Sequence, residues 1–277
     1  MNLKFIINDY MIVWNILFTK SITDKMRSTK RKAWNTYKDE YNKTYYDKKY
    51  ILQDPKNFIP NNDIVYNEII ENDDFKILKK QADKQRIDLI KIWDKNIKKI
   101  DYLSKKIIRK DFRDYLCFVV NNEFDLREVE VVNEEGRIVI GKKYKSEELF
   151  LIDLIYEIVK KEITIKEDDN LGIKDAIIEL AVLNEFGTML NDNSCYNLGN
   201  SELSYLKRQI YPYWLMFLGI PKEDMVKYMM RDKIAFEVNG YAYEKELINM
   251  NIEEFIEFII RNKRYIVRFN RLDTAEG

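Results

Sequence analysis

The chain has 277 residues, of which 46% are hydrophobic and 34% are charged, and its formal net charge is zero. It contains no histidine, which excludes Ser-His-Asp and Cys-His nucleophile pairs, histidine zinc ligands and histidine general bases. It has only eight glycines and no glycine-rich phosphate loop, so nucleotide sites of the P-loop or Rossmann kind are not expected.

The richness in Lys, Asn, Ile and Tyr is typical of an AT-rich genome, such as that of a bacterium or a mobile element. The opening segment MNLKFIINDYMIVWNILFTK is interrupted by Asn8, Asp9 and Asn15, so it predicts a buried amphipathic helix rather than a signal peptide or a membrane span. Cys117 and Cys195 make no disulfide framework. We therefore expect a cytoplasmic protein with reduced thiols.

Helical patterns dominate the first part of the chain. Residues 1–50 predict helix, and DPKNFIPNND then supplies a loop with Pro55 and Pro60. From about residue 63 to 115, apolar residues recur at spacings of three, four and seven between lysines, which predicts a long amphipathic helix or a helical hairpin. Ile77, Ile87 and Trp93 belong to this apolar stripe.

The rhythm then changes to β-branched runs. LCFVV, EVEVV and RIVI, with the turn-like NEEG between the last two, predict a small antiparallel sheet. Helical patterns return in SEELFLIDLIYEIVKKEI, IKDAIIELAVLNEFGTML and SELSYLKRQIYPYWLMFLGI, and again over residues 251–262. Asn239-Gly240 is a hairpin signal, and YIVRF favours a final strand.

Together these patterns predict an α+β fold that is predominantly α-helical, with a small antiparallel sheet near the middle of the chain. We expect a single α-rich unit over residues 1–277. An alternative division separates a basic helical part, residues 1–115, from a sheet and an acidic helical part, residues 116–277. Residues 1–118 carry 26 Lys and Arg against 17 Asp and Glu, and the remainder carries the opposite excess. Such halves can pack on each other or face separate partners.

Four acids lie on two predicted helices at i, i+4 spacing, which places each pair on one helix face: Asp153 and Glu157, and Asp175 and Glu179. Carboxylates among apolar residues need a partner. In one interpretation the four acids hold Mg²⁺ or Mn²⁺ for hydrolysis of a phosphoester or nucleotide, with Lys160 or Lys174 binding the substrate phosphate. In the other they form ion pairs with Lys160, Lys161 or Lys174.

The same segment resembles the zincin metallopeptidases, especially the gluzincin branch, over residues 116–192. Their H-E-x-x-H helix would fall on residues 156–160, where Glu157 matches the general base but Tyr156 and Lys160 replace both metal-binding histidines. Glu179 would occupy the third-ligand position, and RIVIGKK resembles the substrate-side strand. The resemblance implies a metal-free, proteolytically inactive relative that keeps the scaffold for binding.

A basic and aromatic segment lies near the N-terminus, where KMRSTKRKAWNTYKDEYNKTYYDKKY combines charge for phosphates with rings for base stacking. The candidate nucleic-acid contacts are Arg31, Lys32, Trp34, Lys48 and Lys49. Residues 76–113 add many lysines. Acidic residues interrupt both stretches, which is also typical of a solvated face with many salt bridges.

These observations leave three hypotheses about function. The first is an interaction protein without catalytic activity, with a protein partner and no cofactor or membrane. The second is the Mg²⁺- or Mn²⁺-dependent hydrolase, in which Glu157 would be catalytic. The third is a nucleic-acid-binding protein that uses the basic N-terminal half.

Overall fold

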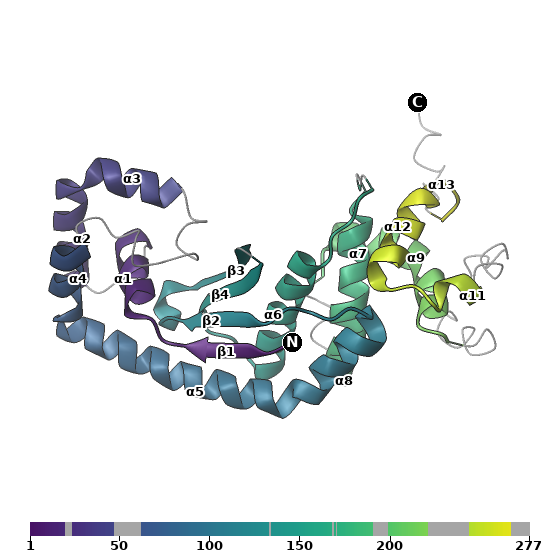
Figure 1. The fold of residues 1–277 in the computed structure, drawn as a ribbon, viewed down its shortest axis with the longest axis horizontal. Coiled ribbons are helices and arrows are strands. Elements are labelled where there is room, and N and C mark those ends of the chain that lie inside the picture. Colours follow the sequence, from purple (N-terminus) through teal and green to yellow (C-terminus); the bar gives the residue numbers. More distant parts are fainter. Residues whose placement is uncertain are drawn as a thin grey trace. The chain divides into compact units, whose positions relative to one another are not determined.

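The computed structural model describes residues 1–19, 24–46, 62–132, 134–167, 169, 171–190, 199–220 and 244–266. The chain divides into two compact units (Figure 1): unit 1 comprises Met1–Ile97 and Phe112–Glu147, and unit 2 comprises Lys98–Asp111 and Glu148–Gly277. The sheet lies in unit 1 with the N-terminal helices. The boundaries of these two units differ from the alternative division into residues 1–115 and 116–277 that the sequence suggested.

Unit 1 contains a four-stranded sheet with the order β1-β2-β4-β3. Its strands are β1 (Leu3–Ile6), β2 (Tyr115–Val119), β3 (Leu126–Val132) and β4 (Glu135–Gly141). β1, β2 and β4 pair in parallel, and β3 pairs with β4 in antiparallel orientation. The short 3₁₀ helix η4 (Asn122–Phe124) joins β2 to β3.

The predicted sheet was therefore wrong in one respect, because it is mixed rather than antiparallel. The expected hairpin is present, because Val132 at the end of β3 pairs with Glu135 at the start of β4, and Glu134 has a φ of 71°. Within this hairpin, β3 is the edge strand of the sheet. β4 therefore lies between β3 and β2 and runs parallel to β2. A fourth strand, β1, lies in the segment expected to be helical.

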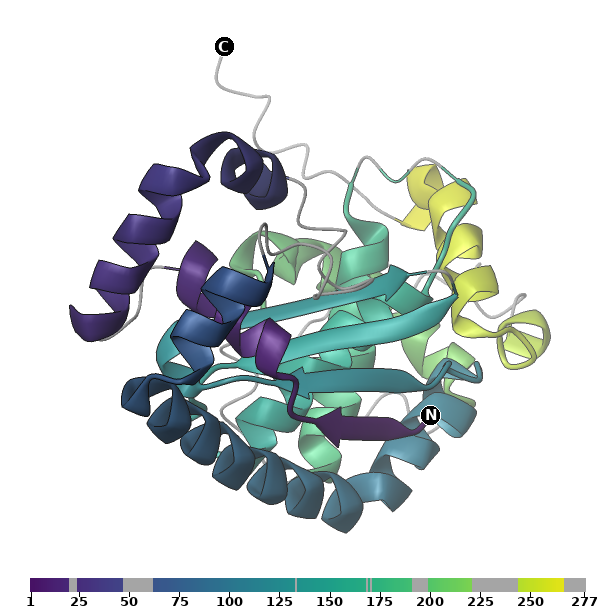
Figure 2. The same cartoon turned by 60° about the vertical axis from the view of Figure 1, so that its left-hand side comes forward.

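The helices of unit 1 are α1 (Asp9–Phe18), α2 (Asp24–Thr36), α3 (Lys38–Tyr46), α4 (Asn62–Ile70) and most of α5 (Asp73–Tyr102). α5 runs alongside the sheet next to β1, and the other helices gather near one end of the sheet (Figure 1 and Figure 2). α1 is buried on nearly all sides and shares a hydrophobic cluster with Phe118 and Val139 of the sheet. On β1, Phe5 makes an edge-to-face contact with Trp93 of α5, with ring centroids 6.4 Å apart.

The long amphipathic helix predicted between residues 63 and 115 is present as α5. Leu89, Trp93 and Ile100 form its buried stripe, whereas Ile77 and Ile87 are exposed and do not belong to it. None of the helices in the described part of the chain is both long and apolar enough to cross a membrane.

Unit 2 is helical over the residues that the structure describes. Its elements are the π-helical η3 (Leu103–Ile108), α6 (Glu147–Glu162), α7 (Ile173–Glu179), the π-helical η5 (Leu180–Phe186), α8 (Gly187–Met189), η7 (Ser201–Leu203), α9 (Ser204–Phe217), α11 (Glu244–Leu247), α12 (Ile252–Arg261) and α13 (Lys263–Ile266). α6 extends into unit 2 from its first residue, Glu147, at the end of unit 1. The three helical segments predicted after residue 146 are confirmed. The strand predicted at YIVRF is wrong at its start, because Ile266 ends helix α13. Asn239-Gly240 and Cys195 lie outside the described residues.

The core of unit 2 contains an aromatic cluster. Trp214 and Phe217 of α9 stack with ring centroids 5.2 Å apart, and Phe217 stacks on Phe255 of α12 at 4.7 Å. Arg109, directly after η3, lies over the Phe217 ring at 4.3 Å. Its guanidinium also donates to three backbone carbonyls, those of Phe217, Ile248 and Met250, at 2.6–2.8 Å. One arginine therefore ties three segments of the unit together.

Candidate functional site

Three of the four predicted acids line one pocket in unit 2. α6 supplies Asp153 and Glu157, and the last residue of α7 supplies Glu179. The pocket has a volume of about 310 Å³ and is lined by Ile152, Asp153, Tyr156, Glu157, Glu179, Leu183 and Asn200. This volume lies at the lower end of the range of about 300–1,000 Å³ that is usual for small-ligand sites.

The lining changes in character with depth. Ile152 and Leu183 are buried, as is Glu179, which is 3% exposed. Asp153, Tyr156 and Glu157 are half-buried, and Asn200 is exposed. The pocket thus combines a largely apolar buried part with carboxylates and a phenol on its more accessible walls.

Glu179 is held by two donors on neighbouring segments. The Lys207 ammonium lies 2.6 Å from its Oε2 atom, and the backbone N–H of Asn200 donates to its Oε1 atom at 2.9 Å. Gly199 permits this close approach, because an added Cβ would lie 2.8 Å from Glu179 Oε2 and 3.0 Å from Lys207 Nζ. The buried carboxylate therefore has the partners that burial requires.

Asp175, the fourth predicted acid, does not line the pocket. It forms an ion pair with Lys160 of α6 at 3.1 Å, as the ion-pair interpretation predicts for this residue. The Lys160 ammonium also lies 6.0 Å from the centre of the Tyr156 ring. The pairing of Glu179 with Lys207 was not predicted.

The pKa of Tyr156 is affected by the acidic residues around the pocket wall. Burial raises the pKa of its phenol well above the usual value, and the negative charges of Asp175, Glu179 and Glu157 raise this pKa further. The phenol therefore stays protonated at neutral pH and lies in a field that disfavours another negative charge.

The donor atoms do not fit a metal ion. Within the described residues, no group of three or more acidic or cysteine side chains is arranged to hold one. Mg²⁺ requires oxygen ligands gathered around one point at 2.0–2.1 Å. Here two of the four predicted acids instead contact lysine ammonium groups, so no metal-assisted step follows from this arrangement.

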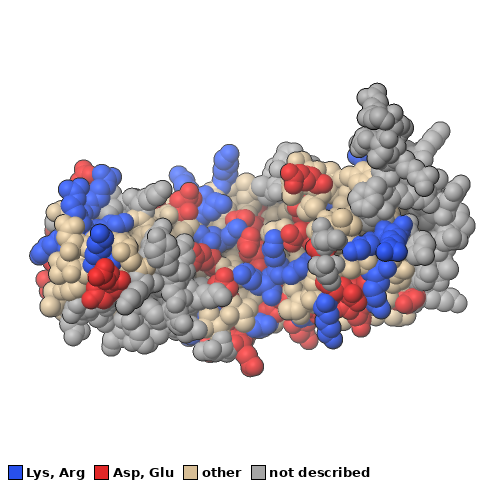
Figure 3. Space-filling view, turned by 90° about the horizontal axis from the view of Figure 1, so that it is seen from above, with Lys and Arg blue, Asp and Glu red and all other residues tan. Residues whose placement is uncertain are grey.

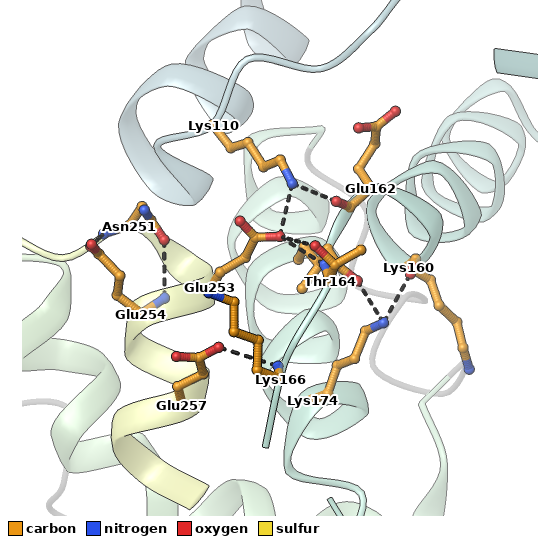
Figure 4. Close-up of polar contacts among 11 residues, drawn as sticks. Lys110, Lys160, Glu162, Thr164, Lys166, Lys174, Asn251, Glu253, Glu254 and Glu257 are labelled. Atoms are coloured by element: carbon orange, nitrogen blue, oxygen red, sulfur yellow. Dashed lines mark hydrogen bonds and ion pairs between the residues drawn. The ribbon is translucent and has the colours of Figure 1, made fainter. Parts of the chain in front are cut away.

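One end of each helix that carries the predicted acids is fixed by a side chain, and Figure 4 shows the contact at the C-terminus of α6. The Lys174 ammonium donates to the carbonyls of Lys160 and Ile163 at 3.1 and 2.7 Å, at the C-terminus of α6. At the N-terminus of α7, the Asp169 carboxylate accepts the backbone N–H groups of Ile173 and Lys174. Neither of the lysines proposed for phosphate binding is therefore directed at the pocket: Lys160 pairs with Asp175, and Lys174 caps α6.

A second set of contacts fixes α12 to the segment after α6 (Figure 4). The Oε1 atom of Glu253 accepts the Lys110 ammonium at 2.8 Å, and it also accepts the backbone N–H and the hydroxyl of Thr164 at 2.7 and 3.1 Å. One turn further along α12, Glu257 accepts the backbone N–H of Lys166 at 3.2 Å. Glu253 and Glu257 therefore hold α12 against the segment that follows α6.

Two of the predicted nucleic-acid contacts that the structure describes, Trp34 and Lys32, have partners within the chain. Trp34 is half-buried, donates to the Leu17 carbonyl at 2.8 Å and contacts the rings of Phe18 and Tyr41. Lys32 pairs with Glu68 at 2.9 Å. Arg31 is exposed, and residues 48 and 49 lie outside the described part of the chain. The aromatic ring expected to stack on bases is therefore used for packing.

The lysines of α5 also have acidic neighbours. Lys76, Arg86 and Lys91 each pair with an aspartate three residues earlier, and Lys79 pairs with Asp9 at 2.8 Å. Figure 3 shows the side away from α5, and there Lys and Arg side chains also lie among Asp and Glu side chains. This arrangement agrees with the solvated, salt-bridged face rather than with a continuous basic groove.

The strand compared with the zincin substrate-side strand is β4. It pairs with β2 on one side and β3 on the other, so its backbone has no free edge for a peptide. Comparisons with protein-family models, with curated proteins and with solved structures gave no significant match. The functional assignment therefore depends on the chemistry of the site.

Proposed function

We propose that this chain is an interaction protein without catalytic activity, on a scaffold similar to that of the zincins. The observation that carries the proposal is the chemistry at the three positions that the resemblance assigns to metal ligands. Tyr156 is a half-buried phenol with a raised pKa, Lys160 is an ammonium paired with Asp175, and Glu179 is a carboxylate paired with Lys207.

The pocket that remains supports binding rather than turnover. Glu157 lies in its wall, at the position that the resemblance assigns to the general base. Among the described residues, however, no three acidic or cysteine side chains are grouped to hold the metal ion with which such a base would work. Without histidine, a general base in this chain would have to be a carboxylate such as that of Glu157, or a lysine, tyrosine or cysteine side chain. We therefore infer that the pocket recognises part of another molecule.

The proposal is tested by melting chelator-treated protein with Mg²⁺, Mn²⁺ or Zn²⁺, alongside the variants Glu157→Gln and Glu179→Gln. An ion that binds only the folded state raises the melting temperature by mass action. We expect no metal-dependent rise. A rise that is lost in both variants would contradict the proposal and favour the hydrolase.

Turnover is tested separately with peptide and phosphodiester substrates, each with and without the three metals. Glu157→Gln is the matched variant, since it removes the only residue with a proposed catalytic role. Background rates identical in the wild-type protein and the variant are expected. A rate that disappears in Glu157→Gln while the fold is retained would show that the chain is an enzyme.

A further inference from the structure

One side of α5 carries a row of exposed side chains. Figure 1 and Figure 2 show no described helix or strand of unit 1 on the side of α5 that faces away from the sheet. On this helix, residues at alternating spacings of three and four share one face. We call the exposed row at this spacing the outer stripe, and it consists of Ile77, Lys80, Lys84, Ile87 and Lys91.

The outer stripe mixes apolar and basic side chains on one helix face. Ile77 and Ile87 are 56% and 42% exposed, and the three lysines are exposed as well. At the same spacing, the next residue on either side is an aspartate, Asp73 or Asp94, so the stripe ends there. The face therefore offers two apolar contact points with lysines beside and between them.

The lysine charges of the outer stripe are not neutralised by neighbouring acids. Within the described part of the chain, neither Lys80 nor Lys84 has an acidic partner, in contrast to the paired lysines elsewhere on α5. Lys91 lies 3.8 Å from Asp88, but these side chains are 72% and 57% exposed, so water screens the pair. The stripe is therefore a surface with excess positive charge.

We propose that the outer stripe is a docking surface for an acidic amphipathic helix of a partner protein. Helices that pack along each other make contact through residues at alternating spacings of three and four, which is the spacing of the stripe. Ile77 and Ile87 bury their exposed carbons against apolar residues of the partner helix. The lysines meet the Asp or Glu residues that flank those apolar residues. This surface lies on unit 1 and does not involve the pocket on α6 and α7.

α5 presents the outer stripe on a helix that is already fixed. Leu78, Leu89 and Trp93 on its opposite face are buried, and the Trp93 ring packs against Phe5 of β1. A partner therefore binds without ordering α5 first, which keeps the entropic cost of binding low. At the helical rise, the stripe is about 21 Å long, which suits a partner helix of about four turns.

Two other classes of macromolecule fit the outer stripe less well. Nucleic-acid phosphates would contact the lysines, but they offer no apolar surface to Ile77 and Ile87. An anionic membrane surface binds helices that have a wide apolar face and lysines on the opposite, polar face. Here isoleucines and lysines share one narrow face, so the pattern favours a protein helix.

The test uses fluorescence anisotropy with a labelled synthetic helix and the full chain. This acidic probe has leucine at alternating spacings of three and four residues and glutamate at the flanking positions. One control probe has glutamine in place of each glutamate, and the other has alanine in place of each leucine. We expect saturable binding of the acidic probe below about 1 mM, and binding at least about tenfold weaker for each control probe.

Variants assign the binding to the outer stripe. Ile77→Ser and Ile87→Ser each remove an apolar contact and should raise the Kd of the acidic probe about tenfold. Lys80→Gln combined with Lys84→Gln removes two charges, so it should raise the Kd about tenfold and make it less sensitive to salt. These three proteins are the stripe variants. All the changed side chains are exposed, and circular dichroism confirms that each variant is folded.

Matched control variants carry the same kinds of change elsewhere in unit 1. Ile64→Ser replaces an isoleucine of α4 that is 65% exposed. Arg31→Gln combined with Lys38→Gln removes two exposed cations from α2 and α3. Both control variants should bind the acidic probe with the Kd of the wild-type protein.

Four results would overturn the proposal: no saturable binding of the acidic probe, equal binding of either control probe, a Kd unchanged in all stripe variants, or an equal loss in the control variants. Phosphatidylcholine–phosphatidylserine vesicles and a thymidine oligonucleotide are measured alongside. Tighter binding of either one, lost in the stripe variants, would replace the helix by a lipid surface or a nucleic acid. Any of these results leaves the proposed function standing, because metal-dependent melting and turnover decide it without the probes.

Discussion

Replacing Lys207 by alanine removes the cation from a carboxylate that is almost completely buried. The side chains of Glu179 and Lys207 are 4% and 19% exposed. At an effective dielectric constant of 20, their 2.6 Å separation corresponds to about 6 kcal/mol of attraction, much of which is offset by desolvation of both groups. Loss of one partner from a buried pair costs about 3–5 kcal/mol.

The lower part of that range applies here. The backbone N–H of Asn200 still donates to Glu179 after the substitution, and water can enter the space that the lysine leaves. We therefore expect Lys207→Ala to lower the free energy of unfolding of unit 2 by about 3 kcal/mol. For a unit of this size, that loss lowers the melting temperature by about 10 °C.

Differential scanning calorimetry is the suitable assay, because it can resolve separate transitions for the two units. Lys160→Ala is the matched control within unit 2. Its ion pair with Asp175 has side chains that are 41% and 37% exposed, so its loss should cost less than about 1 kcal/mol. If Lys207→Ala melted within about 2 °C of the wild-type protein, the ion pair would not stabilise the buried carboxylate and the reasoning would be refuted.

Three further substitutions test other contacts in unit 2. Burial raises the pKa of Glu253, but hydrogen bonds, first that from Lys110, outweigh burial and lower it below 4.5. The carboxylate therefore stabilises the folded protein above pH 4.5, and this contribution is lost as the pH falls through the lowered pKa. In urea denaturation at a series of pH values, the free energy of unfolding of Glu253→Gln should fall less steeply at acid pH than that of the wild-type protein. An equally steep fall would contradict this. Burial raises the pKa of Glu185, partly offset by the Trp214 hydrogen bond, so the wild-type protein loses stability as the pH rises through that pKa. Glu185→Gln should be the more stable protein at pH 7 in chemical denaturation, and a less stable variant would show that the charge is needed. Arg109→Lys keeps the charge but cannot reach three carbonyls, and calorimetry should show a loss of about 2 kcal/mol; wild-type stability would mean that the fork of hydrogen bonds is dispensable.

Helical periodicity made much of unit 2 predictable. Apolar residues at threes and fours outlined α6 and α7 correctly, and i, i+4 spacing placed Asp153 and Glu157 on one face that does line a pocket. The same logic anticipated a lysine partner for Asp175, because Lys160 and Asp175 lie at the edges of facing apolar stripes. The apolar periodicity and the i, i+4 spacing are local properties of a single helix, whereas the ion pair joins α6 to α7.

Other features depend on contacts distant in the chain, and no local pattern contains them. β1 is only four residues long and was read as helix, because its strand character comes from pairing with β2, more than a hundred residues later. Lys207 is one of many lysines, and nothing around it signals that it reaches Glu179, 28 residues away. The same holds for Asn200 and Leu183 in the pocket lining.

Each of the two units is formed by two separate segments of the chain, which affects both its folding during synthesis and the way in which it can be truncated. Unit 1 needs Phe112–Glu147 for three of its four strands, and unit 2 needs Lys98–Asp111, which comes from before that segment. During synthesis from the N-terminus, unit 1 therefore cannot complete its sheet until residue 141 has emerged from the ribosome. A fragment ending at residue 115 would retain β1 without β3 and β4. No single cut of the chain separates the two units from each other.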